Sequence, residues 1–162
     1  MSEIKGKIVA LCISEARGTV KHAVEKAKLI KGYGIEGDAH AGHWHRQVSL
    51  LAIEQVEAFN QRIAASNAQI LARAVEGTFG ENILVRGIDL RKLPVGTLLK
   101  AGNVVLKLSQ IGKECHSHCQ IFQRVGDCIM PREGVFAVVI QGGKIKKGDI
   151  LEKIEETEAH ID

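Results

Sequence analysis

The residues best suited to chemistry in this chain are the cysteines and histidines of one short segment. Cys115 and Cys119 lie four residues apart, with His116 and His118 between them. A helix would place the two thiols on one face. Cationic neighbours such as Lys113 favour the thiolate, which is the form that attacks, carries sulfur or binds metal. This segment is therefore the first candidate for a reactive site.

Three interpretations of these cysteines are open, two as a site and one as inert thiols. Together with Cys128 and a histidine, Cys115 and Cys119 could complete a tetrahedral zinc site. A cysteine–histidine nucleophile is disfavoured because no orienting partner or oxyanion loop is recognisable. Inert buried thiols are the third interpretation, and it suits Cys128 best because only the other two have polar and basic neighbours. Cys12 lies in the apolar run 8–13, where we expect a small core residue.

A second group of polar residues lies in the glycine-rich stretch 34–46. It contains Asp38, His40 and Arg46 together with two further histidines. Such a loop could line a polar pocket, with the Arg46 guanidinium binding an anion. It could equally be a connector whose histidines are solvated. The spacing of the histidines matches no standard structural zinc site.

A third candidate is the pair Glu81 and Asn82, which interrupts an otherwise apolar stretch. Its carboxylate and amide could pair with a polar ligand. Taken alone, a turn is the simpler interpretation, because Gly80 and Asn82 are both typical turn residues.

The hydrophobic pattern predicts the elements that must position these groups. We expect strands over residues 4–13 and 46–51, and an amphipathic helix over 53–63. Two glycine-containing dipeptides, Gly102-Asn103 and Gly142-Gly143, predict hairpins. The paired strands would be 97–101 with 104–109 and 135–141 with 144–150. Short strands joined by glycine turns favour a closed or strongly curved, mainly antiparallel sheet.

The composition limits the classes of partner. The 162 residues predict one domain over 1–162 with a polar tail from about residue 152, and the net charge of +3 is too small to indicate nucleic acid. No apolar run reaches the ~20 residues of a membrane span, and the first residues do not resemble a signal peptide. We therefore expect a cytoplasmic protein with reduced thiols and neither a nucleic-acid nor a membrane partner.

Taken together, the ordered motifs resemble the MOSC domain, the module found at the C-terminus of molybdenum cofactor sulfurases and in small stand-alone bacterial proteins. The resemblance runs from about residue 4 to residue 151. Each motif is weak alone, whereas the ordered set is specific. The matching stretches are 34–40, 46–51, 80–83, 87–90, 93–96, 110–116 with Cys119, 130–137 and 148–149.

The resemblance implies a mainly β fold, a mostly antiparallel β-barrel with one or two short helices. It also implies binding of the anionic molybdopterin form of the molybdenum cofactor. Cys119 or Cys115 would carry sulfur, and Cys119 would be the molybdenum ligand. The expected cofactor-binding residues are Asp38, His40, Arg46, Glu81, Asn82, Lys113 and Arg132. The basic members would offset the phosphate charge, and Glu81 and Asn82 would pair with pterin edges.

The function implied is binding of molybdenum cofactor or its precursor, with sulfur carriage or cofactor handover on a reactive cysteine. The expected partners are a cysteine desulfurase, whose domain this chain lacks, and a molybdoenzyme or cofactor-biosynthesis protein. At family level the resemblance also carries an association with pyridoxal phosphate. One alternative is a zinc-binding or thiol-based regulatory module. Another is a molybdenum-dependent reductase of N-hydroxylated compounds that needs a separate reductase.

Overall fold

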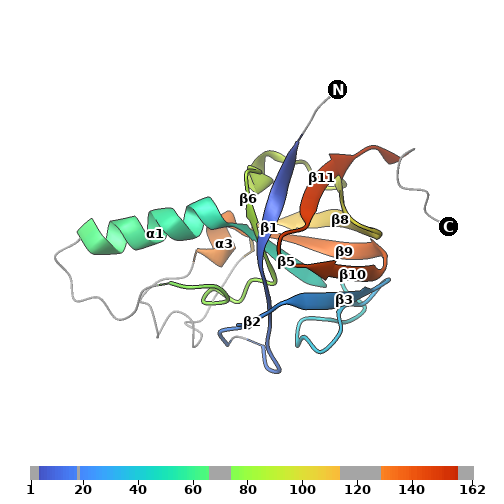
Figure 1. The fold of residues 1–162 in the computed structure, drawn as a ribbon, viewed down its shortest axis with the longest axis horizontal. Coiled ribbons are helices and arrows are strands. Elements are labelled where there is room, and N and C mark those ends of the chain that lie inside the picture. The colour runs from blue at the N-terminus through green and yellow to red at the C-terminus, as the bar shows by residue number, and fades with distance from the viewer. Residues whose placement is uncertain (1–3, 18, 66–73, 114–128, 157–162) are drawn as a thin grey trace.

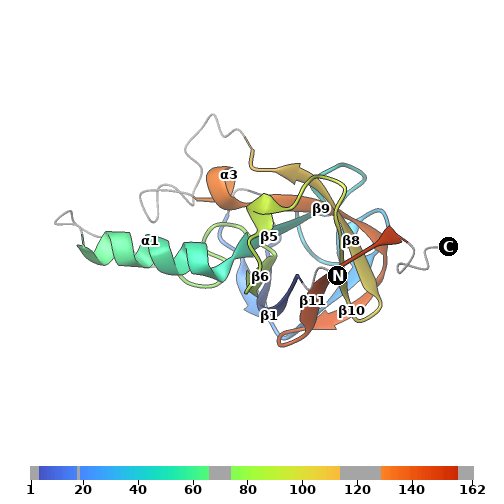
Figure 2. The same cartoon turned by 90° about the horizontal axis from the view of Figure 1, so that it is seen from above.

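A closed β-barrel forms the centre of the computed structural model, which describes residues 4–17, 19–65, 74–113 and 129–156 (Figures 1 and 2). Eight strands form one sheet. Seven of them close into a barrel, because the last strand of the chain pairs with the first. In order around the barrel these are β1 (Lys5–Ile13), β11 (Ile150–Ile154), β7 (Leu98–Ala101), β8 (Val104–Ile111), β9 (Val135–Gln141), β5 (Val48–Ala52) and β6 (Ile83–Arg86). The eighth, β2 (His22–Val24), pairs with the end of β1. The expected barrel is confirmed.

Alternation of apolar and polar residues explains the strand β8. Val104, Leu106 and Leu108 point into the core, and Lys107 is exposed. Val105 breaks the alternation because the register shifts at this position, and its side chain is buried in a small separate cluster with Leu98.

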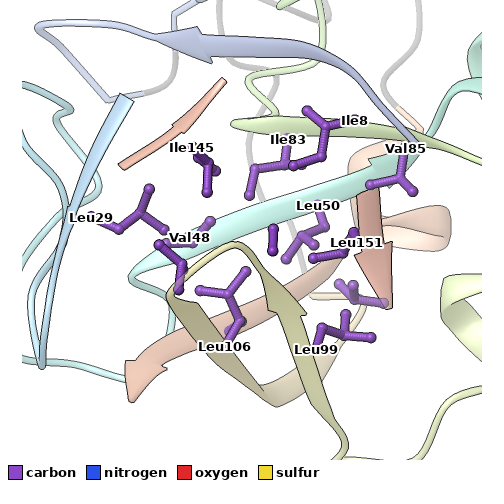
Figure 3. Close-up of a cluster of buried hydrophobic side chains, with 14 of the residues drawn as sticks. Ile8, Leu29, Val48, Leu50, Ile83, Val85, Leu99, Leu106, Ile145 and Leu151 are labelled. Carbon is purple, nitrogen blue, oxygen red and sulfur yellow. The ribbon is translucent and has the colours of Figure 1, made fainter. Parts of the chain in front are cut away.

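The barrel interior is filled by aliphatic side chains from most of its strands. In Figure 3 they point towards one another from opposite walls. The fully buried members labelled there include Ile8, Leu50, Ile83 and Leu99. Close packing of this kind leaves no channel through the barrel, so a ligand site must lie at its rim or outside it.

One helix and one parallel strand pair break the antiparallel pattern. The helix α1 (Ile53–Ala65) begins directly after β5, and β5 pairs in parallel with the later strand β6. A parallel pair needs a crossover connection, which α1 supplies. Val56 and Phe59 of α1 pack on the outer face of the barrel in a second apolar cluster. The predicted helix is confirmed.

The first predicted hairpin is confirmed, and the second is wrong. β7 and β8 pair across Gly102-Asn103 as expected. The predicted strand 144–150 is instead divided between β10 (Gly143–Lys146) and β11, and β10 pairs not with β9 but with β3 (Lys26–Ile30). With β4 (Gly34–Ile35) these form a second, three-stranded sheet.

Burial explains why the chain leaves β9 at Gly142. Ile145 of β10 and Leu29 of β3 both enter the barrel core, and this burial outweighs a local hairpin. Gly142 permits the crossing, because a Cβ there would lie 2.6 Å from the Leu29 carbonyl oxygen. The glycine pair therefore marks a turn without specifying which strand follows it.

Among the described residues, the other helical elements are the 3-10 turn η1 (Leu90–Lys92) and the short helix α3 (Met130–Glu133). In the part of the chain that the structure describes, no helix has the length and apolar character needed to cross a membrane.

Replacing Leu50 by alanine tests the barrel core. Leu50 is fully buried, so Leu50→Ala should lower the free energy of unfolding by about 2–5 kcal/mol in urea titrations. Val95→Ala is the control, because Val95 is 58% exposed and its truncation should change stability by less than about 0.5 kcal/mol. Equal effects of the two substitutions would contradict this assignment of the core.

Candidate functional site

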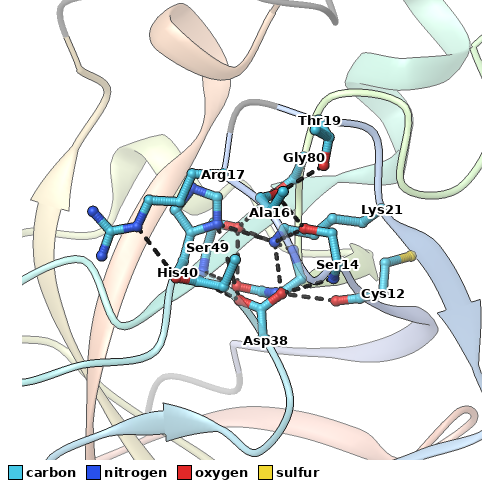
Figure 4. Close-up of polar contacts among 12 residues, drawn as sticks. Cys12, Ser14, Ala16, Arg17, Thr19, Lys21, Asp38, His40, Ser49 and Gly80 are labelled. Carbon is cyan, nitrogen blue, oxygen red and sulfur yellow. Dashed lines mark hydrogen bonds and ion pairs between the residues drawn. The ribbon is translucent and has the colours of Figure 1, made fainter.

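The site is built on a buried carboxylate, Asp38, where the glycine-rich loop meets the end of β1 (Figure 4). Its Oδ1 accepts hydrogen bonds from Lys21 Nζ at 2.6 Å and from the Ser14 backbone N–H at 3.0 Å. Its Oδ2 accepts one from the His40 backbone N–H at 3.1 Å. Asp38 therefore fastens three chain segments together rather than facing solvent.

His40 lies beside this carboxylate and is kept neutral. Its Nδ1 is 3.0 Å from Lys21 Nζ. Burial and the nearby charge of Lys21 lower the pKa of His40 to about 4, against the opposing effect of Asp38, and Lys113 and Arg17 lower it further. The imidazole is therefore uncharged at neutral pH.

Two arginines converge on Trp44. The guanidinium carbons of Arg17 and Arg46 lie 4.6 Å and 4.7 Å from the centre of its ring, within cation–π range. The indole N–H donates to the His40 carbonyl oxygen at 2.8 Å, and Arg17 Nε donates to the Ala39 carbonyl oxygen at 3.2 Å. These contacts hold both guanidinium groups next to His40.

Arg46 has an unsatisfied donor. Its Nε is buried and has no hydrogen-bond partner among the described residues. Such an atom is costly unless something accepts its hydrogen bond. The Arg46 guanidinium also lies 5.7 Å from the ring of Phe136, and Lys113 Nζ lies 5.9 Å from the same ring. Lys113 and Arg46 thus contact the same aromatic ring, and a third positive charge lies near the two arginines.

Lys113 is held at this place by backbone contacts. Its N–H donates to the Pro131 carbonyl oxygen, and the Gly112 N–H donates to the Gly134 carbonyl oxygen. Gly112 has a φ of +68°, and a Cβ there would lie 2.7 Å from the Pro131 carbonyl oxygen, so glycine is required. The chain on either side of residues 114–128 is therefore joined at the edge of the cationic cluster.

We call Arg17, Arg46 and Lys113, with Trp44 and His40, the cationic cluster. Within the described ranges no salt bridge joins its three charged side chains to a carboxylate, and Asp38 already pairs with Lys21. The cluster therefore offers positive charge and hydrogen-bond donors together, which suits an oxyanion such as a phosphate.

Glu81 and Asn82 lie beneath the site and are fully buried. The Asn82 Oδ1 accepts from the Ser49 N–H at 2.9 Å, and its Nδ2 donates to the Cys12 carbonyl oxygen at 3.0 Å, so one side chain links β1 and β5. The carboxylate oxygens of Glu81 accept from the backbone N–H groups of Gly77 and Phe79. In the contacts that the structure describes, both side chains thus form hydrogen bonds with backbone groups of neighbouring segments.

The structure thus brings four of the predicted binding residues into one region: Asp38, His40, Arg46 and Lys113. Arg132 lies exposed on α3. Cys115, Cys119 and Cys128 lie outside the described residues. Cys12 is buried as predicted, and burial raises the pKa of its thiol above the ordinary range. Within residues 4–17, 19–65, 74–113 and 129–156, no group of three or more histidine, cysteine or acidic side chains could hold a metal ion.

Sequence reasoning missed four residues of the site: Ser14, Arg17, Lys21 and Trp44. Lys21 carries no sequence signal at all, because its burial depends on Asp38 from a distant loop. Trp44 had a usable signal, since the chain's one tryptophan stands two residues before Arg46.

Replacing Asn82 by alanine tests its role in linking strands. The Ser49 N–H and the Cys12 carbonyl would lose their buried partner, so Asn82→Ala should cost about 2–5 kcal/mol of unfolding free energy. The control is Gln141→Ala, which removes one exposed side-chain hydrogen bond to the Asn103 carbonyl and should cost less than about 1 kcal/mol. A difference of zero between the variants would refute the structural role.

The burial of Glu81 predicts how the stability of the protein depends on pH. Desolvation by burial raises the pKa of Glu81 to about 7, above its ordinary value of 4.5, despite the hydrogen bonds from Gly77 and Phe79. The folded protein therefore binds more protons than the unfolded chain between pH 4.5 and 7, and this contribution to stability is lost as the pH rises through that window.

The unfolding free energy of the wild type relative to Glu81→Gln should thus fall by on the order of 3 kcal/mol from pH 4.5 to 7. Comparison with the variant cancels the opposite contribution of His40, whose lowered pKa stabilises the fold as the pH rises. A difference that is independent of pH would show that Glu81 keeps an ordinary pKa.

Comparison with known proteins identifies the fold and the family. The fold is similar to the YuaD protein from Bacillus subtilis, with a TM-score of 0.74 and 20% identity over 94% of this chain and 97% of that one. It is also similar to YiiM from Geobacillus stearothermophilus (TM-score 0.70, 17% identity, 96% of this chain and 79% of that one) and to YiiM from Escherichia coli (0.64, 17%, 96% and 71%). No curated protein sequence matches significantly. The family model of the MOSC domain matches residues 37–152, and the chain therefore belongs to the MOSC domain family.

Proposed function

We propose that this protein binds the molybdenum cofactor or its molybdopterin precursor, with the phosphate on the cationic cluster. The observation that carries the proposal is the buried Nε of Arg46, to which no described residue offers an acceptor. A phosphate oxygen would satisfy that donor, and the charges of Arg17 and Lys113 would add to its binding.

The described residues fit such a ligand in charge and in donor chemistry. The guanidinium of Arg46 is fixed between two aromatic rings, so little side-chain entropy is lost on binding. His40 is neutral at physiological pH and offers a hydrogen-bond donor. Asp38 positions the loop through its ion pair with Lys21. Arg132 on α3 is proposed as a further cation for the ligand.

Glu81 and Asn82 have a different part in this proposal. Both are completely buried, and their side chains bond to backbone groups of neighbouring segments. We propose that they shape the floor under the ligand. Pairing of Glu81 and Asn82 with pterin edges would require both side chains to leave these backbone partners.

The thiol chemistry is proposed for Cys119 or Cys115. Lys113, at the edge of the cationic cluster, is the last described residue before these cysteines. Positive charge favours the thiolate. The bound cofactor would supply molybdenum, for which a thiolate, proposed as that of Cys119, is a suitable soft ligand. Sulfur carriage would need a cysteine desulfurase as donor, and a molybdoenzyme or biosynthetic protein would receive the product.

The test is to identify the small molecule that the protein retains when expressed in a host that makes molybdenum cofactor. Mass spectrometry of the released ligand should detect a pterin phosphate. Arg46→Gln should reduce the retained amount by about 10- to 100-fold, because a charge-assisted hydrogen bond contributes about 1.5–3 kcal/mol.

Arg86→Gln is the matched control. Arg86 is an exposed arginine paired with Glu57 on the outer face of the barrel, and its replacement should leave retention unchanged. The proposal would be overturned if the protein retained stoichiometric zinc and no pterin, and if Cys115→Ser and Cys119→Ser each lost that zinc. Such a result would favour a zinc-binding module.

A further inference from the structure

Lys21 is a buried cation whose surroundings determine the chemistry of its neighbour. Its side chain is fully buried. Three acceptor atoms surround Nζ: Asp38 Oδ1 at 2.6 Å, His40 Nδ1 at 3.0 Å and Ser14 Oγ at 3.1 Å. An ammonium group has three hydrogens to donate and no lone pair to accept with. The three contacts therefore account for all three hydrogens.

The hydrogen-bond directions in this network are mutually consistent. Ser14 Oγ donates its own hydrogen to the Ala16 carbonyl oxygen at 3.0 Å, which leaves a lone pair for Lys21 (Figure 4). The Asp38 carboxylate can only accept. His40 Nδ1 must then accept as well, so it carries no hydrogen, and the proton of the neutral ring lies on Nε2.

The charges around His40 favour the same state. Lys21, Lys113 and Arg17 all disfavour an imidazolium, as does burial, and Asp38 alone favours it. Asp38 Oδ2 is 4.0 Å from Nδ1 and is already bonded to the His40 backbone N–H. The ring therefore stays neutral and keeps one tautomer.

We infer that Lys21 is a positioning residue that fixes His40 as a neutral Nε2–H donor, so that His40 binds an oxygen acceptor of the ligand and does not ligate a metal. The lone pair of Nδ1 is used by Lys21, and Nε2 is protonated, so neither nitrogen is available to a cation. This deepens the proposed function: in that setting the acceptor would be a phosphate or another anionic oxygen of the cofactor.

The tautomer can be measured in the ligand-free protein. In protein with 15N-labelled histidine, with the His40 signals assigned from a His40→Gln variant, long-range 1H–15N spectra should show a bare Nδ1 and a protonated Nε2. Titration should give His40 a pKa of about 4, below the 6.5 of an ordinary histidine. A protonated Nδ1, or an ordinary pKa, would overturn the inference.

Lys21→Met tests the cause. Without the ammonium, the freed Asp38 carboxylate lies close enough to favour a proton on Nδ1. The tautomer should reverse, and the pKa of His40 should rise from about 4 towards its ordinary value, because burial still opposes the charged ring. Arg17→Gln is the control. It removes a positive charge that lowers the pKa of His40, and in the described contacts Arg17 bonds to the Ala39 carbonyl oxygen and not to the ring. The tautomer should therefore persist, with a smaller rise in pKa.

Lys21→Met could unfold, because it leaves Asp38 buried and unpaired. A double variant, Lys21→Met with Asp38→Asn, removes both charges and should leave His40 without a fixed tautomer. If either variant folds and keeps the wild-type tautomer and pKa, Lys21 is not the positioning residue.

Two probes test the choice of ligand. Inorganic phosphate should shift the Nε2–H signal of His40, and zinc ions should not. Binding of zinc to His40, or the lack of any response to phosphate, would overturn the inference that His40 binds an oxygen acceptor and not a metal. Because none of these measurements needs a pterin, they can succeed or fail independently of the search for the retained cofactor.

Discussion

The buried ion pair between Lys21 and Asp38 is the interaction on which the arrangement of the site depends. It joins the segment after β1 to the glycine-rich loop, and the same carboxylate bonds the backbone of Ser14 and His40. Breaking such a pair from one side typically costs about 3–5 kcal/mol, because the remaining charge stays buried. Loss of either partner would therefore release the loop that carries Trp44 and Arg46.

Above this pair, aromatic rings organise the positive charge. Trp44 contacts the cations of Arg17 and Arg46, and Phe136 contacts those of Arg46 and Lys113, and an aromatic ring carries no charge that would neutralise them. A carboxylate in their place would stabilise the fold but would compete with an anionic ligand. Among the described residues, the cluster thus combines fixed geometry with charge that no carboxylate offsets, which is the condition for binding an anion with little reorganisation.

The sequence predicted the fold better than the site, for physical reasons. Strands and the helix depend on local periodicity, and β1, β5, α1 and the β7–β8 hairpin were predicted. The pairing of β10 with β3 was not, because burial of Ile145 is a long-range effect. In the site, polar loop residues such as His40 and Arg46 stood out by composition. Lys21 did not, because a lysine in a polar connection between strands is normally solvated, and only the folded chain supplies its three acceptors.

Closure of the barrel has a consequence for how the protein is made. Lys7 of β1 pairs with Ile150 of β11, so the first and last strands of the barrel are neighbours. During translation, β1 cannot complete its pairing until β11 has left the ribosome. Until then, β1 and β7 each present an unpaired strand edge. Contacts so distant in sequence also make folding slow. Nascent chains of this protein should therefore depend on chaperones that shield exposed strand edges until synthesis is complete.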